Sequence, residues 1–172
     1  MKKVIALAGM LCSSIALAGP GDQVTYPEGY KDNYTPYLSL NRTRNDDQYI
    51  RLFINDTGLS GTEANGQLPY GSKIVAEIYK VVKDADGKVV TSSLGQRIPN
   101  KFAAIAVMER RKGAAAEYPE GLGNDDWDFA VFKPDGKRAD KDLLKCASCH
   151  APYKETHYLF SYEHIIAEQK LK

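Results

Sequence analysis

The sequence predicts an α+β fold, in which a mostly antiparallel β-sheet is flanked by a few helices and a Cys-x-x-Cys-His motif lies on a C-terminal helix. Three observations support this prediction. Segments with alternating side chains and many β-branched or aromatic residues fill the middle of the chain. Turn sequences that contain Asp and Gly separate these segments. Helical patterns dominate only after the last of these turns, so strands and helices occupy separate parts of the chain.

The first 18 residues have the features of a secretory signal peptide. Lys2 and Lys3 precede an apolar stretch over residues 4–17, and Ala16 and Ala18 form a small-residue cleavage pattern. The apolar stretch is too short to span a bilayer comfortably. We therefore predict cleavage near Ala18, a periplasmic protein, and a single domain over residues 19–172.

The charge of the mature chain is nearly balanced. Loss of Lys2 and Lys3 leaves 21 basic residues against 22 acidic ones, so the net charge is about −1 with neutral histidines. Such a balance argues against a nucleic acid or an anionic membrane as the partner.

The strand-like segments follow one another from residue 47 onward. A short helix over residues 29–40, interrupted by Pro36, is expected before them. Alternation and β-branched residues then predict strands within residues 47–55, 73–84, 101–111 and 127–134. Residues 84–88 read as a hairpin loop into a further short strand at residues 89–93, and residues 133–137 as the turn that closes the last strand.

Two helices are expected at the C-terminal end. The first covers residues 139–150, with Asp140 as its N-cap, and ends before Pro152. The second covers residues 162–172. The first of them carries the Cys-x-x-Cys-His motif.

This motif gives the strongest chemical signal in the sequence. On a helix, Cys146, Cys149 and His150 stand at i, i+3 and i+4, so their side chains emerge on one face. That placement suits two thioether bonds to the vinyl groups of a haem and one axial bond to its iron, and c-type haem is attached outside the cytoplasm. We therefore predict one covalent haem c with His150 as the iron ligand.

Two other uses of the cysteines fit the sequence less well. A thioredoxin-like redox pair would follow a strand within a βαβ unit, whereas this motif lies near the end of the chain with no strand after it. A zinc site would need further ligands. The remaining histidines, His157 and His164, have a spacing that misses the usual one.

The second axial position of the iron decides the functional class. Electron carriers usually supply a second strong ligand, often Met. No methionine follows His150, and Met108 is the only one left after signal cleavage. As a strand residue, Met108 is expected to belong to the core, which leaves an iron with one protein ligand and an open position for small molecules.

Several segments together resemble the cytochrome P460 family, which includes the β-sheet cytochromes c′. The segments are "LPYGSKIVAEIY", "DDWDFAVFKPDGK", "CASCH" and "YLFSYEHI", and the resemblance spans nearly the whole mature chain. It implies a β-rich α+β fold, a homodimer, one haem c ligated by His150, and a distal pocket walled by the sheet.

The family divides by chemistry at two positions. Its hydroxylamine-oxidising members carry a lysine cross-linked to the haem and a distal glutamate. The resemblance aligns Ala76 with the lysine, and it aligns Ala104, Ile105 and Ala106 with the region of the glutamate. The nearby Lys73, Lys80 and Glu109 are expected to be solvated, whereas Phe53, Ile78 and Phe102 are candidates to line an apolar distal pocket.

These observations favour a five-coordinate haem c protein that binds NO or CO. Two alternatives stay open: an enzyme that oxidises hydroxylamine or NO, and a simple electron-transfer cytochrome. A redox partner such as another cytochrome is compatible with each of them.

Overall fold

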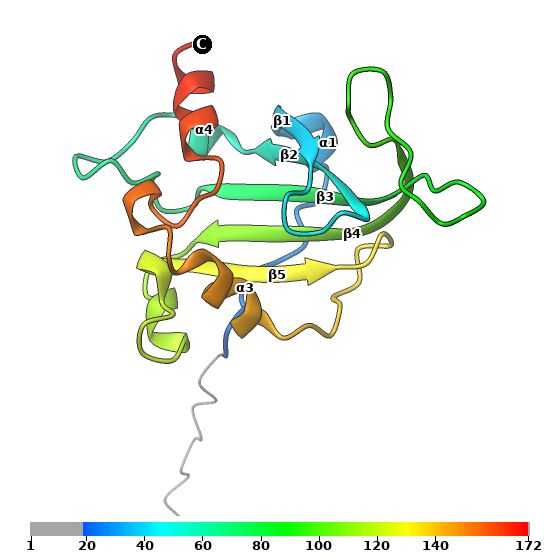
Figure 1. Cartoon of the computed structure of the whole chain (residues 1–172). Coiled ribbons are helices and arrows are strands. Elements are labelled where there is room, and N and C mark those ends of the chain that lie inside the picture. Colours follow the sequence, from blue (N-terminus) through cyan, green and yellow to red (C-terminus); the bar gives the residue numbers. More distant parts are fainter. Residues whose placement is uncertain (1–18, 172) are drawn as a thin grey trace, which may run out of the picture.

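The computed structural model of the protein describes residues 19–171. Its centre is a five-stranded antiparallel sheet in which strands that are consecutive in the chain are also neighbours in the sheet (Figure 1). The strands are β1 (Thr35–Asn41), β2 (Gln48–Ile54), β3 (Lys73–Val81), β4 (Pro99–Arg110) and β5 (Trp127–Phe132). This architecture confirms the predicted α+β fold. The predicted signal peptide, residues 1–18, lies outside the described residues.

The helices are short. They are α1 (Tyr30–Asn33), α2 (Asp56–Leu59), α3 (Leu143–His150) and α4 (Tyr162–Gln169), with single 3-10 turns η1 (Ala114–Glu117), η2 (Asn124–Asp126) and η3 (Lys154–Thr156). Among residues 19–171, none forms a helix of the length and apolarity that crossing a membrane requires.

The segment before β2 differs from the prediction. Instead of a helix over residues 29–40, α1 ends at Asn33 and the edge strand β1 follows. Pro36 is tolerated because β1 lies at the edge of the sheet, and the pairing with β2 is irregular between Pro36 and Leu38. The prediction gave too much weight to the helix and missed this strand.

The helix that carries the cysteines begins later than expected. Asp142, rather than Asp140, is the N-cap, and its carboxylate accepts a hydrogen bond of 3.1 Å from the backbone N–H of Leu144. The motif still falls within α3, as predicted.

The connection between β3 and β4, residues 82–98, projects beyond the sheet (Figure 1). Only single bridges, Lys83 with Val89 and Thr91 with Arg97, pair its backbone as antiparallel strands do. The strand expected at residues 89–93 is therefore absent from this described segment. Its side chains find no layer to pack on, and Leu94 is 87% exposed.

The two faces of the sheet carry separate hydrophobic clusters. We call the face covered by α3 and α4 the helix face, and the face covered by residues 24–34 the N-terminal face. Buried residues of the helix face include Ile54, Ile74 and Phe129. Their neighbours Phe53, Val75 and Ala130 point to the N-terminal face, as the two-residue period of a strand requires.

A buried carboxylate lies on the N-terminal face. Glu77 is 1% exposed and accepts hydrogen bonds of 2.7 Å from the hydroxyls of Tyr30 and Tyr79, while Lys31 Nζ lies 3.2 Å from its Oε1. Burial by itself raises the pKa of Glu77, but these hydrogen bonds and the ammonium charge outweigh it, so the pKa lies below its usual value.

We expect Glu77→Gln to lower the stability at neutral pH by about 1–3 kcal/mol, because the pair of buried hydroxyls loses an ionised acceptor. Since the folded pKa of Glu77 is depressed, its contribution is present above the unfolded pKa of about 4.3 and is lost as the pH falls through the folded value. Urea unfolding at several pH values from neutral to acid should show the two proteins converging at low pH. The exposed control Glu28→Gln should follow the wild type, and a constant difference at all pH values would contradict the assignment.

Candidate functional site

A cavity of about 540 Å³ lies between α3 and the helix face of the sheet. Cys146, Cys149 and His150 line it from α3, as their helical spacing predicts. Both cysteines are free thiols in the structure. The opposite wall comes from the five strands of the sheet, and the size is typical of small-molecule and cofactor sites.

The His150 ring is held in one orientation. Its Nδ1 lies 2.6 Å from the carbonyl oxygen of Tyr158, and a carbonyl can only accept. Nδ1 must therefore carry the proton, which leaves Nε2 free as a metal ligand. Burial lowers the pKa of His150, which favours the neutral, ligating form.

The Tyr158 carbonyl that orients His150 belongs to an unusual turn at residues 157–158. His157 and Tyr158 both have left-handed backbone conformations, with φ of 52° and 63°. Non-glycine residues seldom adopt this conformation, and it persists where the surrounding structure enforces it. Phe129 and Phe160 flank the imidazole, with ring centroids 5.2 and 4.3 Å from that of His150.

The helix that carries the cysteines is tied to the start of β5. Asn124 is buried, and its Nδ2 donates a hydrogen bond of 2.9 Å to the carbonyl of Ala147, between the two cysteines. Asn124, Asp125 and Asp126 all have positive φ. The sequence patterns did not identify this anchor, and the only local signal for it is that Asn and Asp adopt left-handed conformations more readily than other residues.

The sheet wall of the cavity is apolar. Ala76 of β3 and Ala106 of β4 are direct cross-strand partners and both line it, with Leu52 next to Ala76 on β2. Two of the positions that the resemblance aligns with polar residues of the hydroxylamine-oxidising members, Ala76 and Ala106, are therefore neighbours in the cavity wall.

Of the three side chains expected to line the pocket, the structure brings only Ile78 to it. Phe53 points to the N-terminal face, where it contacts Tyr30 at a centroid distance of 5.4 Å. Phe102 also packs against that face, because the pairing of β3 with β4 shifts between Ile78 and Tyr79. The expectation for both residues was wrong: Phe53 alternates with the lining residue Leu52 along a regular strand, whereas the shift in pairing turns Phe102 to the other face.

The polar residues close to these positions lie elsewhere. Lys73 and Glu109 are cross-strand partners that form an ion pair of 3.0 Å, and neither lines the cavity. Their side chains are only 14% and 19% exposed, so the expectation that both are solvated was wrong. Lys80 is exposed at the far end of β3. Within the described part of the chain, the cavity lining contains no Asp or Glu.

Met108 does line the cavity. Its cross-strand partner on β5 is Phe129, the residue whose ring contacts His150. Met108 is half-buried and packs against the cluster of the helix face. It therefore stands at the His150 end of the sheet wall, two residues along β4 from Ala106.

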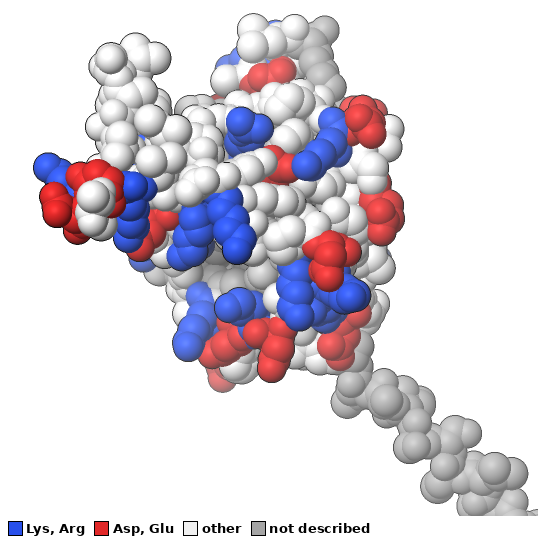
Figure 2. Space-filling view, turned by 90° about the vertical axis from the view of Figure 1, so that its right-hand side faces the viewer, with Lys and Arg blue, Asp and Glu red and all other residues white. Residues whose placement is uncertain are grey.

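Cationic side chains also line the cavity. Arg42 and Arg44, from the loop between β1 and β2, and Lys145 of α3 all contribute to its lining. Figure 2 shows Lys and Arg side chains around a hollow on the side of the molecule that it displays. The sequence patterns did not assign these residues, since nothing in their local pattern links them to the cysteines.

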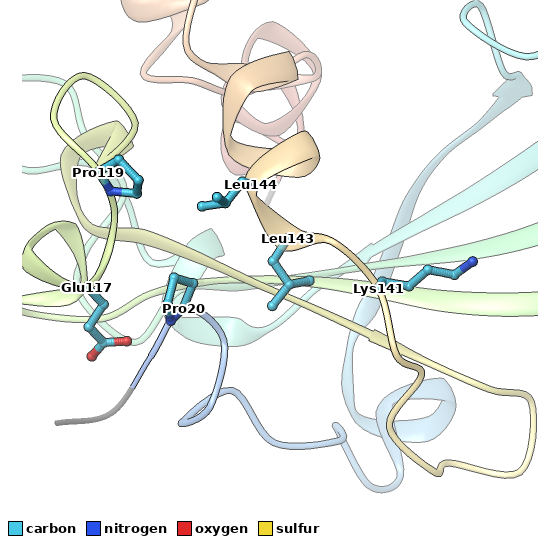
Figure 3. A pocket seen from close by; sticks show the side chains of 6 residues that line it. All are labelled: Pro20, Glu117, Pro119, Lys141, Leu143 and Leu144. Atoms are coloured by element: carbon cyan, nitrogen blue, oxygen red, sulfur yellow. The ribbon is translucent and has the colours of Figure 1, made fainter. Parts of the chain in front are cut away.

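A second hollow lies at the start of α3, lined by Pro20, Glu117, Pro119, Lys141, Leu143 and Leu144 (Figure 3). It is open to solvent. Arg111 donates a hydrogen bond of 2.6 Å to Oε1 of Glu117, whereas the buried Oε2 of this carboxylate has no hydrogen-bond partner among the described residues. None of the Cys-x-x-Cys-His residues lines this hollow, and its described lining brings no cluster of catalytic or metal-binding side chains together.

The residues of the large cavity fit a haem c. Two thiols and an imidazole with a free Nε2 line one side, an apolar wall lies opposite, and three cationic side chains also contribute to the lining. The competing uses of the cysteines fit less well. The sheet is antiparallel and contains no βαβ unit, and no group of three or more His, Cys, Asp or Glu gathers as a metal site in residues 19–171.

Comparison with protein families agrees with this geometry. The family model Cytochrome P460 matches residues 27–161, which is most of the chain. Comparison with curated proteins gives no match. The match includes the sheet and the Cys-x-x-Cys-His helix, so the chain belongs to the cytochrome P460 family of haem c cytochromes, with Cys146 and Cys149 as its candidate attachment residues.

Proposed function

We propose that the protein is an exported mono-haem cytochrome in which His150 is the single strong protein ligand of the iron and in which NO or CO binds in an apolar distal pocket. The observation that carries the proposal is the cross-strand pair of Ala76 and Ala106 in the cavity wall. When bound, the haem supplies an iron at which a diatomic gas can bind. The protein residues around it decide which gases are favoured and whether a bound molecule can be turned over.

The apolar wall favours some gases over others. Bound dioxygen is polarised and gains stability from a hydrogen-bond donor, whereas NO binds ferrous haem well without one. Ala76, Ala106, Leu52 and Ile78 present only hydrocarbon. A wall of this kind supports binding of NO or CO, with sequestration, transport or slow turnover of NO as the biological use.

The same wall offers no group for the chemistry of hydroxylamine oxidation. That reaction releases several protons as electrons are withdrawn, and a positioned base contributes on the order of 10²- to 10⁴-fold to such steps. Glu109 is paired with Lys73 outside the cavity, and no carboxylate lines the cavity in the described residues. We therefore propose ligand binding rather than this enzymatic activity.

Export, cleavage near Ala18 and a homodimer are part of the proposal. The basic and apolar pattern of residues 1–18 supports export, and haem c attachment is compatible with it. The family resemblance supports the homodimer. A redox partner would be needed to reduce the iron before gas binding.

The proposal is tested by absorption spectra of the purified, reduced protein with and without CO. We expect a five-coordinate spectrum that changes to a six-coordinate one on addition of CO. Met108→Ala should leave both spectra unchanged, because Met108 stands at the His150 end of the wall. A reduced protein that is six-coordinate before gas is added, and that becomes five-coordinate in Met108→Ala, would instead establish an electron carrier.

We also expect no lysine cross-link and little hydroxylamine turnover. Tryptic digestion and mass spectrometry should give a haem peptide that contains only the segment around Cys146 and Cys149. A haem peptide that also contains Lys73 or Lys80, together with catalytic hydroxylamine oxidation, would overturn the proposal in favour of the enzyme.

A further inference from the structure

The charges along the cavity are distributed unevenly. Its sheet wall is hydrocarbon, whereas Arg42, Arg44 and Lys145 contribute cations to the lining and no Asp or Glu does so in residues 19–171. A ligand that matches this lining is an apolar body with anionic groups at one edge. A haem has that form, since its macrocycle carries two propionates.

Arg42 and Arg44 differ from three other arginines of the protein. Arg97, Arg110 and Arg111 each pair with a carboxylate, at N–O distances of 2.6 to 3.0 Å. The described residues give Arg42 and Arg44 no carboxylate. Arg42 donates to the side-chain oxygen of Gln48, and Arg44 donates a hydrogen bond of 3.0 Å to the hydroxyl of Tyr153.

These contacts leave donors free. A guanidinium has five N–H donors, and its planar fork matches a carboxylate. The Arg44 guanidinium also lies over the ring of Phe160, 5.7 Å from its centroid, and Phe160 in turn contacts His150. Arg44 is therefore held close to the imidazole that would ligate the iron, with donor capacity to spare.

The loop that carries both arginines is fixed from a distant part of the chain. Arg97 Nη1 donates to the carbonyls of Arg42, Asn45 and Gln48 at 2.9, 3.0 and 3.1 Å. Its Nη2 donates to Asp46 Oδ1 at 2.6 Å. The Arg97 side chain is only 15% exposed. Its guanidinium therefore binds the backbone of the loop at three carbonyls from a largely buried position.

We propose that Arg42 and Arg44 bind the haem propionates and that Arg97 is the positioning residue that holds their loop. This inference rests on the proposed haem site and adds the residues that would bind the carboxylates of the haem. Guanidinium groups that neutralise the propionates offset negative charge near the iron. They therefore stabilise the ferrous state and raise the reduction potential.

The test compares haem proteins by spectroelectrochemical titration and by resonance Raman bands of the propionates. Arg42→Gln with Arg44→Gln should lower the midpoint potential and shift the propionate bands. Arg44→Lys, which keeps the charge, should lie closer to the wild type than Arg44→Gln, and it serves if the double variant is poorly produced. The control Lys112→Gln removes an exposed charge just after the C-terminal end of β4, at the end of the sheet away from the loop that carries Arg42 and Arg44. It should change neither measurement.

Arg97 is tested by a double-mutant cycle. Arg97→Gln alone should lower the potential, and it should lower it less when Arg42 and Arg44 are already glutamine, because a positioning residue acts through them. Equal effects in the two backgrounds would show that Arg97 acts only through its own charge and would remove it from the proposal.

The outcomes separate this inference from the proposed function. The double variant Arg42→Gln with Arg44→Gln is compared with the wild type once it is shown to hold its haem and to bind CO. If its midpoint potential and Raman bands then equal those of the wild type, the propionate assignment alone is overturned. Absence of covalent haem in the wild-type protein would overturn the proposed function as well.

Discussion

Replacing both Cys146 and Cys149 with serine is expected to abolish covalent haem retention completely. The two thiols line the cavity from one face of α3, and no other cysteine occurs in the described residues. A serine hydroxyl does not form the thioether that holds haem c. Mass spectrometry of denatured protein, made together with the haem-attachment machinery, should show one haem on the wild type and none on the variant.

The single variants serve as controls for this experiment. Cys146→Ser and Cys149→Ser each leave one thiol in place, so partial retention is compatible with attachment through both residues. Ser148→Ala changes the exposed position between them and should retain the haem fully. Covalent haem on the doubly substituted protein would refute attachment at these cysteines.

Asp128→Ala is expected to lower the free energy of unfolding by about 3–5 kcal/mol, because it removes one partner of a buried ion pair. Asp128 is fully buried and accepts hydrogen bonds from the N–H of Gly21, the hydroxyl of Tyr118 and the guanidinium of Arg111, at 2.8, 2.6 and 2.9 Å. Its removal leaves the buried hydroxyl of Tyr118 without its acceptor and leaves the partly buried Arg111 with Glu117 as its remaining ion-pair partner. It also detaches Gly21 from the N-terminal face.

Chemical denaturation monitored through Trp127, the only tryptophan, measures this effect. The matched control is Asp135→Ala, in the exposed turn after β5, where the ion pair with Lys137 is 3.5 Å long. An exposed pair of this kind contributes little to stability, because solvent screens the two charges. Equal losses in the two variants would show that the buried network around Asp128 does not carry the stability assigned to it.

Local sequence patterns predicted the attachment site. Cys146, Cys149 and His150 lie within five residues of one another, so helical geometry alone places them on one face. The antiparallel sheet was predictable for a similar reason, since alternation and turn residues are properties of short segments. The same locality explains the failure at β1, where Pro36 and several tyrosines give no clear period and only pairing with β2 decides the conformation.

The lining of the cavity depended on pairing between distant strands. By simple alternation, Phe102 would share a face with Ala104 and Ala106. The irregularity between Ile78 and Tyr79 places it with Tyr79 instead. A bulge of this kind arises from the fit of two strands, so neither strand reveals it alone.

Local sequence patterns were sufficient to predict the α+β class and the helix that carries Cys146, Cys149 and His150. Contacts between distant residues set which side chains face the cavity, the orientation of His150 by the carbonyl of Tyr158, and the hydrogen bonds from Arg97 to the loop that carries Arg42 and Arg44. The two kinds of feature differ in the distance along the chain over which their interactions act. Side-chain period and helix spacing act over a few residues, whereas strand register and the hydrogen bonds of Arg97 join residues about fifty positions apart, which no local pattern encodes.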